Sequence, residues 1–337
     1  MNSLAIIVLN WNGADDALNC VESLQQQTLR PEIIIVDNNS SDDSVDRFED
    51  YVKSQKKDVP ILIKNSQNLG FAGGINTGLA YAKEHNFEYI GVLNPDAIAD
   101  KEWCQALVDE LSSHPKCGIT TGILQRRNSK TLDTTGDFYT TWGLPGPRNR
   151  DELIKNAPDK PGEVFGATGG GAIYRTAIFD DIDMFDEDFF MYYEDVDLSF
   201  RAQLADWKVR FTPKAIAYHK VGASSKKVPG LAVYNTFKNL PLVFIKNVPG
   251  KLFWYIGLRF FLTYWLIFAS AVRHGNGWPA FKGMLASIIR KPAAYKKRLT
   301  IQKNRKVSVD YIRNIIHKGP LPNQTGLLKF KRFFRIK

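Results

Sequence analysis

The strongest constraint on the fold is a regular alternation of short apolar runs with amphipathic stretches over the first 113 residues. Four runs are rich in Leu, Ile and Val and are short enough to be buried strands. The stretches between them place apolar side chains on one helical face, as Leu18, Val21 and Leu24 do. This alternation predicts an α/β fold with a mostly parallel sheet flanked by helices. The expected strands are 4–9, 32–36, 61–63 and 89–93, and the expected helices fall near 14–27, 42–56, 72–86 and 101–113.

Charge divides the chain into two regions. Residues 226–337 contain 23 Lys and Arg but one acid, Asp310, whereas residues 1–225 have 22 Lys and Arg against 34 Asp and Glu. We therefore expect an acidic α/β domain over residues 1–225, followed by a basic, mainly helical region over residues 226–337. A strongly basic region binds a polyanion, either nucleic acid or an anionic membrane surface.

Cysteine spacing and the N-terminus restrict the class of protein further. Cys20, Cys104 and Cys117 form no Cys-x-x-Cys pair, which excludes a disulfide framework and a cysteine zinc site and favours buried thiols in a reducing compartment. The first residues, MNSLAIIVLNWNG, show no basic stretch and no small-residue cleavage site, so we expect no secretory signal. The first strand is not followed by G-x-G-x-x-G, which argues against a dinucleotide-binding fold.

Polar residues follow three of the expected strands, at the ends where ligands bind in open α/β sheets. They are Asn10-Trp11-Asn12-Gly13, residues 37–42 and Asn94-Pro95-Asp96. Each group alone would serve as a turn or a helix cap, but three at one edge of a sheet indicate a binding site. Asp37 is placed to accept the N3–H of a pyrimidine, and Asp96 is a hard-oxygen ligand suited to Mg²⁺ or Mn²⁺.

The densest group of functional side chains lies at residues 189–201, FFMYYEDVDLSFR. Glu194, Asp195 and Asp197 open an expected helix, where acids interact favourably with the helix dipole without performing any chemistry. The aromatic run before them indicates instead a partly desolvated pocket, in which a carboxylate can act as a general base.

Two glycine-rich stretches and one histidine have alternative interpretations. Residues 68–76 (NLGFAGGIN) and 166–171 (GATGGG) are either flexible loops or places where a ligand approaches backbone N–H groups. His219 ends the expected strand 215–219 and is either a core histidine or a contact to a metal or phosphate.

Taken in order, these motifs resemble the family 2 inverting glycosyltransferases of the GT-A fold, most closely the rhamnosyltransferase-like branch that builds bacterial surface polysaccharides. The matching motifs, over about residues 3–225, are VLNWNG, IIIVDNNSSDDS, NLGFAGGINTG, YIGVLNPDA, GATGGGAIYR, FDEDFFMYYEDVDLSFRA and AYHKVG. The resemblance implies a GT-A catalytic domain with a nucleotide-sugar half at 1–100 and an acceptor half at 101–225. It implies transfer of a sugar from a nucleotide diphosphate donor, dTDP-rhamnose before UDP-hexoses, to a lipid-linked or cell-surface saccharide.

The resemblance also assigns site residues. Asp195, with Glu194 beside it, takes the place of the catalytic base, and Asp96, with His219, takes the place of the ligands to Mg²⁺ or Mn²⁺. Inverting transfer is one in-line displacement, which needs a base for the acceptor hydroxyl and a cation for the departing diphosphate. The residues expected to bind the nucleotide sugar are Asn10, Asn12, Asp37, Asn39, Asn68, Gly70, Gly73, Asn76 and Asn94.

Two motifs depart from the family pattern. The acidic D-x-D position reads Asn94-Pro95-Asp96, with one carboxylate in place of two or three, which implies weaker metal binding and a need for His219. The stretch before the aromatics reads Asp183-Met184-Phe185-Asp186-Glu187, where the family often has Gly-Gly-Phe-Asp-Glu. This second departure concerns the acceptor side and leaves the base unaffected.

Segment 252–272 points to a membrane contact. It is 21 apolar-rich residues interrupted by Arg259, with aromatic residues along its length and basic residues on both flanks. A spanning helix and a buried core helix both fit its length, but the mixture is typical of a helix that lies in the interface. The basic and aromatic segment 329–337 suits lipid headgroups as well. We expect a peripheral, monotopic protein on the cytoplasmic face of the bacterial inner membrane.

Two other functions compete with sugar transfer. A sugar-nucleotide nucleotidyltransferase would carry a glycine- and arginine-rich activating loop near the N-terminus, which the sequence does not show. A non-enzymatic polyanion-binding protein would use the basic region, but a nucleic-acid binder stacks bases on the aromatics of a basic domain, whereas residues 1–225 are acidic. We therefore expect no nucleic-acid partner.

Overall fold

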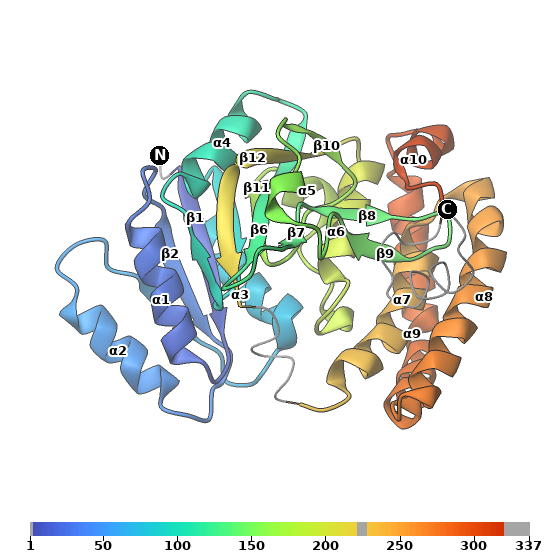
Figure 1. The fold of residues 1–337 in the computed structure, drawn as a ribbon, viewed down its shortest axis with the longest axis horizontal. Coiled ribbons are helices and arrows are strands. Elements are labelled where there is room, and N and C mark those ends of the chain that lie inside the picture. The colour runs from blue at the N-terminus through green and yellow to red at the C-terminus, as the bar shows by residue number, and fades with distance from the viewer. Residues whose placement is uncertain (1–2, 221–227, 320–337) are drawn as a thin grey trace.

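The computed structural model describes residues 3–220 and 228–319 (Figure 1). Its first part has β1 (Leu4–Asn10), α1 (Ala14–Gln25), β2 (Glu32–Asp37), α2 (Ser44–Ser54), β3 (Ile61–Lys64), α3 (Gly70–Glu84) and β4 (Tyr89–Leu93). Strands β4, β1, β2 and β3 are neighbours in this order, and all run parallel. The predicted alternation of strands and helices is confirmed, with bounds that differ by a few residues.

The second part extends the same sheet beyond β4. Strand β11 pairs antiparallel with both β4 and β6, so β6 runs in the same direction as β4. Strand β12 lies parallel to β6, and β10 pairs antiparallel with β12 at the edge. The α/β class is confirmed, with a parallel first half and a mixed second half. The elements are β5 (Ala97–Ala99), α4 (Trp103–Ser112), β6 (Cys117–Arg126), β7 (Leu132–Thr134), β8 (Asp137–Tyr139), β9 (Pro145–Pro147), η1 (Ile154–Asn156), β10 (Gly162–Val164), β11 (Gly171–Arg175), α5 (Ile178–Ile182), η2 (Glu187–Phe189), α6 (Glu194–Leu204) and β12 (Lys208–His219).

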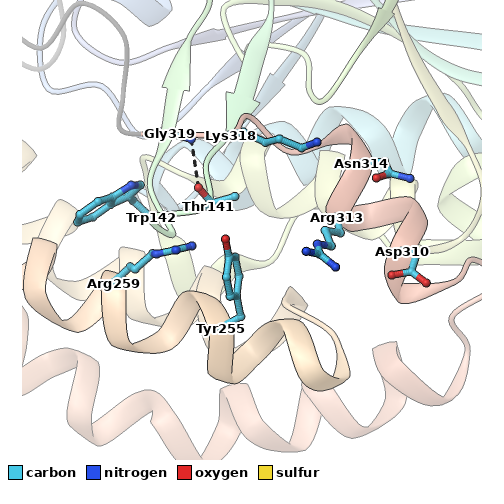
Figure 2. Close-up of a pocket in the computed structure, with 9 residues that line it drawn as sticks. All are labelled: Thr141, Trp142, Tyr255, Arg259, Asp310, Arg313, Asn314, Lys318 and Gly319. Carbon is cyan, nitrogen blue, oxygen red and sulfur yellow. Dashed lines mark hydrogen bonds between the residues drawn. The ribbon is translucent and has the colours of Figure 1, made fainter.

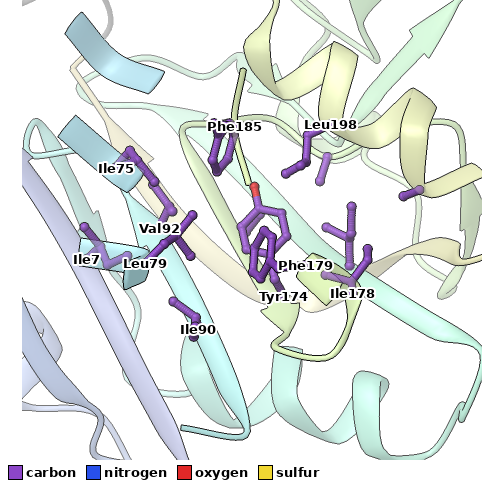
Figure 3. Close-up of a cluster of buried hydrophobic side chains, with 14 of the residues drawn as sticks. Ile7, Ile75, Leu79, Ile90, Val92, Tyr174, Ile178, Phe179, Phe185 and Leu198 are labelled. Carbon is purple, nitrogen blue, oxygen red and sulfur yellow. The ribbon is translucent and has the colours of Figure 1, made fainter. Parts of the chain in front are cut away.

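The core has a layer on each face of this sheet. Along β1, Ala5 and Ile7 pack in one layer while Leu4 and Ile6 pack in the other, as the two-residue period of a strand requires. The first layer lies between the sheet, α3 and α5, where Ile7 and other apolar side chains meet (Figure 3). Because helices cover both faces, a ligand reaches this sheet at the carboxyl ends of its strands.

Within residues 228–319, four helices pack at the opposite end of the molecule from α2 (Figure 1). They are α7 (Leu231–Asn247), α8 (Gly250–Arg273), α9 (Gly277–Lys303) and α10 (Val309–Ile315). A third core cluster joins them to the α/β body, because Phe189, Phe200 and Leu204 pack with Phe237 and Val243. The acidic α/β body and the basic helices therefore share a core.

Candidate active site

Buried polar contacts connect the ends of β1 and β2. Asn10 and Asp37 are register partners, and the Asn10 amide donates to Asp37 Oδ1 at 3.0 Å. Ser40 donates to both Asp37 oxygens, from its hydroxyl at 2.6 Å and from its backbone N–H at 2.9 Å. A carboxylate offers about four acceptor positions, so Asp37 can accept a further donor. The buried Asn10 Oδ1 has no hydrogen-bond partner among the described residues.

Asn12 and Asn39 shape the loops that follow these strands. Both have left-handed backbone, with φ of +54° and +60°, a conformation that Asn tolerates better than most residues. The backbone N–H of Asn12 donates to Ser40 Oγ at 2.8 Å, and its side-chain oxygen accepts from the N–H of Ser41 at 2.7 Å. Asn12 thus holds the loop after β1 against the loop after β2.

Asn38, which sequence reasoning did not select, connects the β2 end to the start of α3. Its amide donates to Asn68 Oδ1 at 3.0 Å and to Gly70 O at 2.9 Å, and its oxygen accepts from the N–H of Leu69 at 3.1 Å. The predicted residue Asn68 is therefore held near the strand ends by a buried neighbour of Asp37. The sequence could have indicated Asn38 by its position, because it comes directly after Asp37 at the end of an apolar run.

The stretch 68–76 is a loop only as far as Leu69, because α3 begins at Gly70, two residues before the start expected for this helix. Cβ atoms at Gly74 and Gly78 would lie 2.5 Å and 2.8 Å from the side chains of Leu9 and Ile7. These glycines allow the helix to pack directly on β1.

The predicted residues Gly70, Gly73 and Asn76 all lie within α3. Gly70 has φ of +70°, and a Cβ there would lie 2.4 Å from the carbonyl oxygen of Phe190. Gly73 packs against the side chain of Leu69, the residue before the helix. The Asn76 amide donates to the carbonyl oxygen of Phe185 at 2.8 Å and to Glu187 Oε1 at 2.9 Å. Asn76 thus supports the segment that leads to the acidic motif.

The predicted metal ligands lie together because β5 pairs antiparallel with β12, which aligns His219 with Ala97. His219 Nε2 lies 3.0 Å from Asp96 Oδ1, and its Nδ1 lies 2.8 Å from Asp133 Oδ2. The predicted residue Asn94 has its side-chain nitrogen 3.3 Å from the same Nε2. Sequence reasoning missed Asp133, because β7 is a three-residue strand without a motif.

These carboxylates set the charge on His219. Burial disfavours the protonated ring, but the hydrogen bonds and charges of Asp133 and Asp96 outweigh it and raise the pKa of His219 to about 9. Among the described residues, no group of three or more acidic, His or Cys side chains is arranged around one metal position. Asp96 and His219 fit a two-ligand site when the His219 ring is deprotonated, because a metal takes the place of the Nε2 proton. Asp133 is the kind of partner that orients a metal-binding histidine, and Mg²⁺ completes its shell with phosphate oxygens and water.

Asp195 lies in the first turn of α6 against the glycine stretch 166–171. The backbone N–H of Gly169 donates to its Oδ2 at 2.7 Å, and the N–H of Val196 donates to its Oδ1 at 2.8 Å. Burial raises the pKa of Asp195, although these N–H groups favour the charged form. A buried carboxylate with a raised pKa is a stronger general base than an exposed one.

The glycine stretch joins the two predicted centres. Gly169 donates to Asp195, and the carbonyl oxygen of the next residue, Gly170, accepts from the backbone N–H of Asn94 at 3.0 Å. Asn94 begins the turn that carries Asp96. The base candidate and the metal-ligand candidates therefore border one backbone segment.

The glycosyl transferase family 2 profile matches residues 5–183, more than half of the chain. The chain belongs to glycosyl transferase family 2. Poly-beta-1,6-N-acetyl-D-glucosamine synthase of Staphylococcus epidermidis is 25% identical over 207 residues, which are 60% of this chain and 45% of that protein. The chain thus spans about half the length of this relative.

Two solved structures show the same fold. One is S. aureus TarS 1-349 in complex with UDP-GlcNAc, with a TM-score of 0.56 and 14% identity over 94% of this chain and 93% of that one. The other is the mannosyltransferase PcManGT of Pyrobaculum calidifontis in complex with GDP-Man and Mn²⁺, with a TM-score of 0.53 and 15% identity over 99% and 81%. The GT-A fold class expected for a family 2 member is confirmed.

The three acids of the motif at the start of α6 have different surroundings. Glu194 is buried, and its Oε2 has no hydrogen-bond partner among the described residues. Asp197 is fully buried and binds Arg201 at 2.9 Å, Lys246 at 2.8 Å and the Asn247 amide at 2.7 Å. Asp197 is neutralised by these cations, which lower its pKa against the effect of burial. Of these three carboxylates, Asp195 is the one that accepts from the glycine stretch 166–171, which also borders the Asn94 turn.

The loop before this motif is held by α7, outside the region that the family 2 profile matches. Lys238 Nζ donates to the carbonyl oxygens of Asp188 and Phe189 at 3.1 Å and 3.0 Å. The Asn239 amide donates to the carbonyl oxygens of Phe189, Met191 and Tyr192 at 3.0, 2.9 and 2.8 Å. Sequence reasoning did not select either residue, because both lie in an apolar helix without a recognisable motif.

Proposed function

We propose that this chain is a metal-dependent inverting glycosyltransferase that moves a sugar from a nucleotide diphosphate donor to a saccharide acceptor. The observation that supports this most strongly is the backbone segment Gly169-Gly170. Its Gly169 N–H binds Asp195, and its Gly170 carbonyl oxygen binds the N–H of Asn94. A base and a metal-binding carboxylate at one segment are the two groups that the displacement requires.

In the proposed reaction, Asp195 accepts the proton of the acceptor hydroxyl. The hydroxyl oxygen forms its bond to the anomeric carbon, and the carbon–oxygen bond to the diphosphate breaks on the opposite face, which inverts the configuration. The diphosphate leaves with the electron pair of that bond. When bound, a divalent cation held by Asp96 and His219 supplies the charge that stabilises the leaving group.

The strand ends of β1 and β2 support a pyrimidine nucleotide as the donor. Asp37 retains acceptor capacity for a ring N3–H, and the buried Asn10 Oδ1 is available to a donor group of the nucleotide. The TarS structure contains a uridine diphosphate sugar, which agrees with this class. We place dTDP-rhamnose first and UDP-hexoses second.

The exposed faces of α8 and α9 support membrane association. Within residues 3–220 and 228–319, α8 is the one helix long and apolar enough to span a bilayer, which by itself is weak support for spanning. Its stripe Leu252, Ile256 and Phe260 is buried in the shared core, so α8 is a packed helix with one free face. The apolar side chains exposed on α8 and α9 are Trp254, Tyr255, Leu258, Phe261, Leu262, Trp265, Leu266, Val272, Trp278, Phe281, Leu285, Ile288, Ile289, Tyr295 and Leu299.

Such a face, beside many Lys and Arg, suits a helix lying in the interface of an anionic leaflet. We propose peripheral, monotopic binding to the cytoplasmic face of the inner membrane, where a lipid-linked saccharide is the acceptor. Segment 329–337, predicted to contact headgroups, lies outside the described residues.

A donor screen tests the proposed function. Each nucleotide sugar is added with Mn²⁺ or Mg²⁺, and the thermal unfolding midpoint is measured. A ligand present at about 100 times its Kd adds about 2.7 kcal/mol to the stability. We expect protection by one pyrimidine nucleotide sugar, metal-dependent transfer of that sugar, and loss of both effects in excess chelator or in Asp96→Ala. Full transfer in excess chelator would contradict the metal dependence, and protection by no nucleotide sugar would contradict the function.

A further inference from the structure

A pocket of about 560 Å³ lies outside the active site, between α8, α10 and the loop that joins β8 to β9 (Figure 2). Three cationic side chains line it, Arg259 from α8, Arg313 from α10 and Lys318, against one carboxylate, Asp310. The pocket is therefore cationic. Its other lining residues are Thr141, Trp142, Tyr255, Asn314 and Gly319.

Two of the cations flank one tyrosine. Figure 2 shows Arg259 and Arg313 on either side of Tyr255, whose hydroxyl points into the hollow. The Arg259 guanidinium lies 4.1 Å from the centre of the Tyr255 ring. A hydrogen bond from Arg259, together with the charges of Arg259, Arg313 and Lys318, lowers the pKa of Tyr255. The hollow is thus a region of positive potential with hydroxyl and amide groups beside it.

These cations differ from two lysines of the same region that are engaged in ion pairs. Lys246 and Lys297 each bind the Asp186 carboxylate. In the part of the chain that the structure describes, Arg259, Arg313 and Lys318 form no ion pair. Their charges remain available to an anion, and guanidinium groups bind phosphate oxygens in pairs.

The pocket borders the exposed apolar face of α8. Leu258 directly precedes Arg259 and is 68% exposed, and Trp254 directly precedes Tyr255 and is 79% exposed. On a helix the next residue lies about 100° around the axis, so apolar side chains flank the pocket along its α8 side. A ligand that satisfies both features has a phosphate group attached to an apolar body.

We propose that this pocket binds the phosphodiester headgroup of an anionic membrane lipid, while the acyl chains lie along the exposed face of α8. The inference rests on the proposed membrane association and makes it specific, since it locates one lipid at Arg259, Arg313 and Lys318. Diffuse attraction of the basic region to a charged surface would show no dependence on which cations are removed.

Vesicle binding by the full chain tests the pocket. The probes are phosphatidylcholine vesicles with and without phosphatidylglycerol, and the readout is the dissociation constant from flotation. The test variant is Arg259→Gln/Arg313→Gln, and the matched control is Arg273→Gln/Lys291→Gln, which removes the same charge from exposed positions on α8 and α9. If the double variant loses its thermal transition, Arg313→Gln alone, at an exposed position of α10, replaces it as the test variant.

We expect the pocket variant to lose about tenfold more affinity for phosphatidylglycerol vesicles than the control does. Equal losses in the two variants would overturn the site in favour of diffuse attraction. Competition by inorganic phosphate that abolishes vesicle binding would assign the pocket to a free anion and overturn the lipid. No binding of the wild type to either vesicle would overturn membrane association itself, while the donor screen would still report on sugar transfer.

A second inference follows from the contacts of Asn239, independently of the pocket. The loop before Asp195 has left-handed backbone at Phe190, Tyr192 and Tyr193, with φ of +61°, +68° and +72°. Such conformations are costly for bulky residues and persist when the surroundings determine them. The Asn239 amide binds three carbonyl oxygens of this loop, and Asn239 is fully buried.

We infer that Asn239 is a positioning residue for the catalytic base. It fixes the loop whose last residue, Tyr193, directly precedes α6, and thereby sets the orientation of Asp195. The basic C-terminal region then has a role in catalysis besides any role at the membrane. This inference rests on the proposed assignment of Asp195.

A matched pair of variants tests this role. Asn239→Ala removes the loop contacts, whereas Asn235→Ala removes an equally buried amide on the same helix that donates to Leu231 O at 3.1 Å. We expect Asn239→Ala to lower kcat about 10- to 100-fold at unchanged donor KM, with a loss of thermal stability similar to that of Asn235→Ala.

Equal effects of the two variants on kcat would overturn the positioning role. An increase in donor KM without a change in kcat would do the same. Asp195→Asn, measured in the same assay, separates failure of this inference from failure of the base assignment.

Discussion

Two adjacent carboxylates, Glu194 and Asp195, show how surroundings divide roles between like residues. Asp195 accepts two backbone N–H groups and borders the glycine stretch. Glu194 has a buried oxygen without a partner in the described structure, and burial together with the charge of Asp195 raises its pKa well above the ordinary value. Glu194 is therefore neutral over a wider pH range than an exposed glutamate, and it lacks the Gly169 N–H contact that favours the charged form of Asp195.

Glu194→Gln should retain most of the transfer activity and gain stability at alkaline pH. Because the folded pKa is raised, the stability that Glu194 contributes is present below its ordinary pKa and is lost as pH rises toward the folded value. Gln has no such loss, so the difference in unfolding free energy between variant and wild type should grow with pH. Urea unfolding at several pH values measures it. A difference that shrinks with pH would show that Glu194 is charged and stabilised in the fold.

The candidate site residues whose location the sequence could predict are those at or just after the ends of strands. Asn10 and Asp37 end β1 and β2, and Asp96 lies in the turn after β4. The apolar composition of these strands predicts their burial, and the ends of parallel strands meet at one edge of a sheet. Asp133 and Asn239 could not be predicted, because their proximity to His219 and to the aromatic loop arises from tertiary packing. Their sequence neighbourhoods are those of an ordinary short strand and an ordinary apolar helix.

At the scale of elements, α6 and α7 are joined by buried charge. Lys246, from α7, binds both Asp186 and Asp197, and its side chain is 3% exposed. Burial opposes ionisation of Asp186, but Lys246 and Lys297 outweigh it and hold the pKa of that carboxyl well below its usual range. The stability from Asp186 is therefore present above the ordinary carboxyl pKa and is lost as pH falls through the folded value.

Lys246→Met should destabilise the protein by about 3–5 kcal/mol, because it leaves two buried carboxylates without their shared cation. The control is Lys306→Met, which removes an exposed pair with Asp181 and should cost less than about 1 kcal/mol. Urea unfolding measures both values. A Lys246→Met cost as small as that of the control would contradict the buried network.

Glycines in α3 illustrate what a motif leaves open. NLGFAGGIN predicts close approach of some group to the backbone, and two groups fit that prediction equally well, a ligand or a neighbouring strand. The structure shows that Gly74 and Gly78 face Leu9 and Ile7 of β1. The distinction depends on where the helix begins, which is the least predictable property of an element.

At the scale of the whole molecule, charge and packing divide the chain differently. The sequence predicts a region boundary near residue 225, from the change in charge. The apolar cluster around Phe200 and Phe237 crosses it, because amphipathic helices bury their apolar faces wherever a complementary face exists. The location of that complementary face is a tertiary property that the charge pattern does not contain.

A chain truncated after residue 225 should therefore fail to reach a native fold. The truncation removes α7 to α10, which would expose Phe189 and Phe200. It would also leave Asp186 and Asp197 without Lys246. The expected result is a broad or absent thermal transition and binding of a hydrophobic dye. A cooperative transition with normal donor binding would show instead that residues 3–220 fold alone.

The assignment of Asp195 as the base of a sugar transfer is tested most directly by Asp195→Asn. The amide preserves size and hydrogen bonding but accepts no proton at neutral pH. Turnover and donor dissociation constant are measured side by side for the wild type, Asp195→Asn and Glu194→Gln. We predict that Asp195→Asn lowers turnover about 10²-fold or more with donor binding unchanged, while Glu194→Gln stays near wild type. Near-normal turnover in Asp195→Asn, with turnover lost in Glu194→Gln, would contradict the assignment.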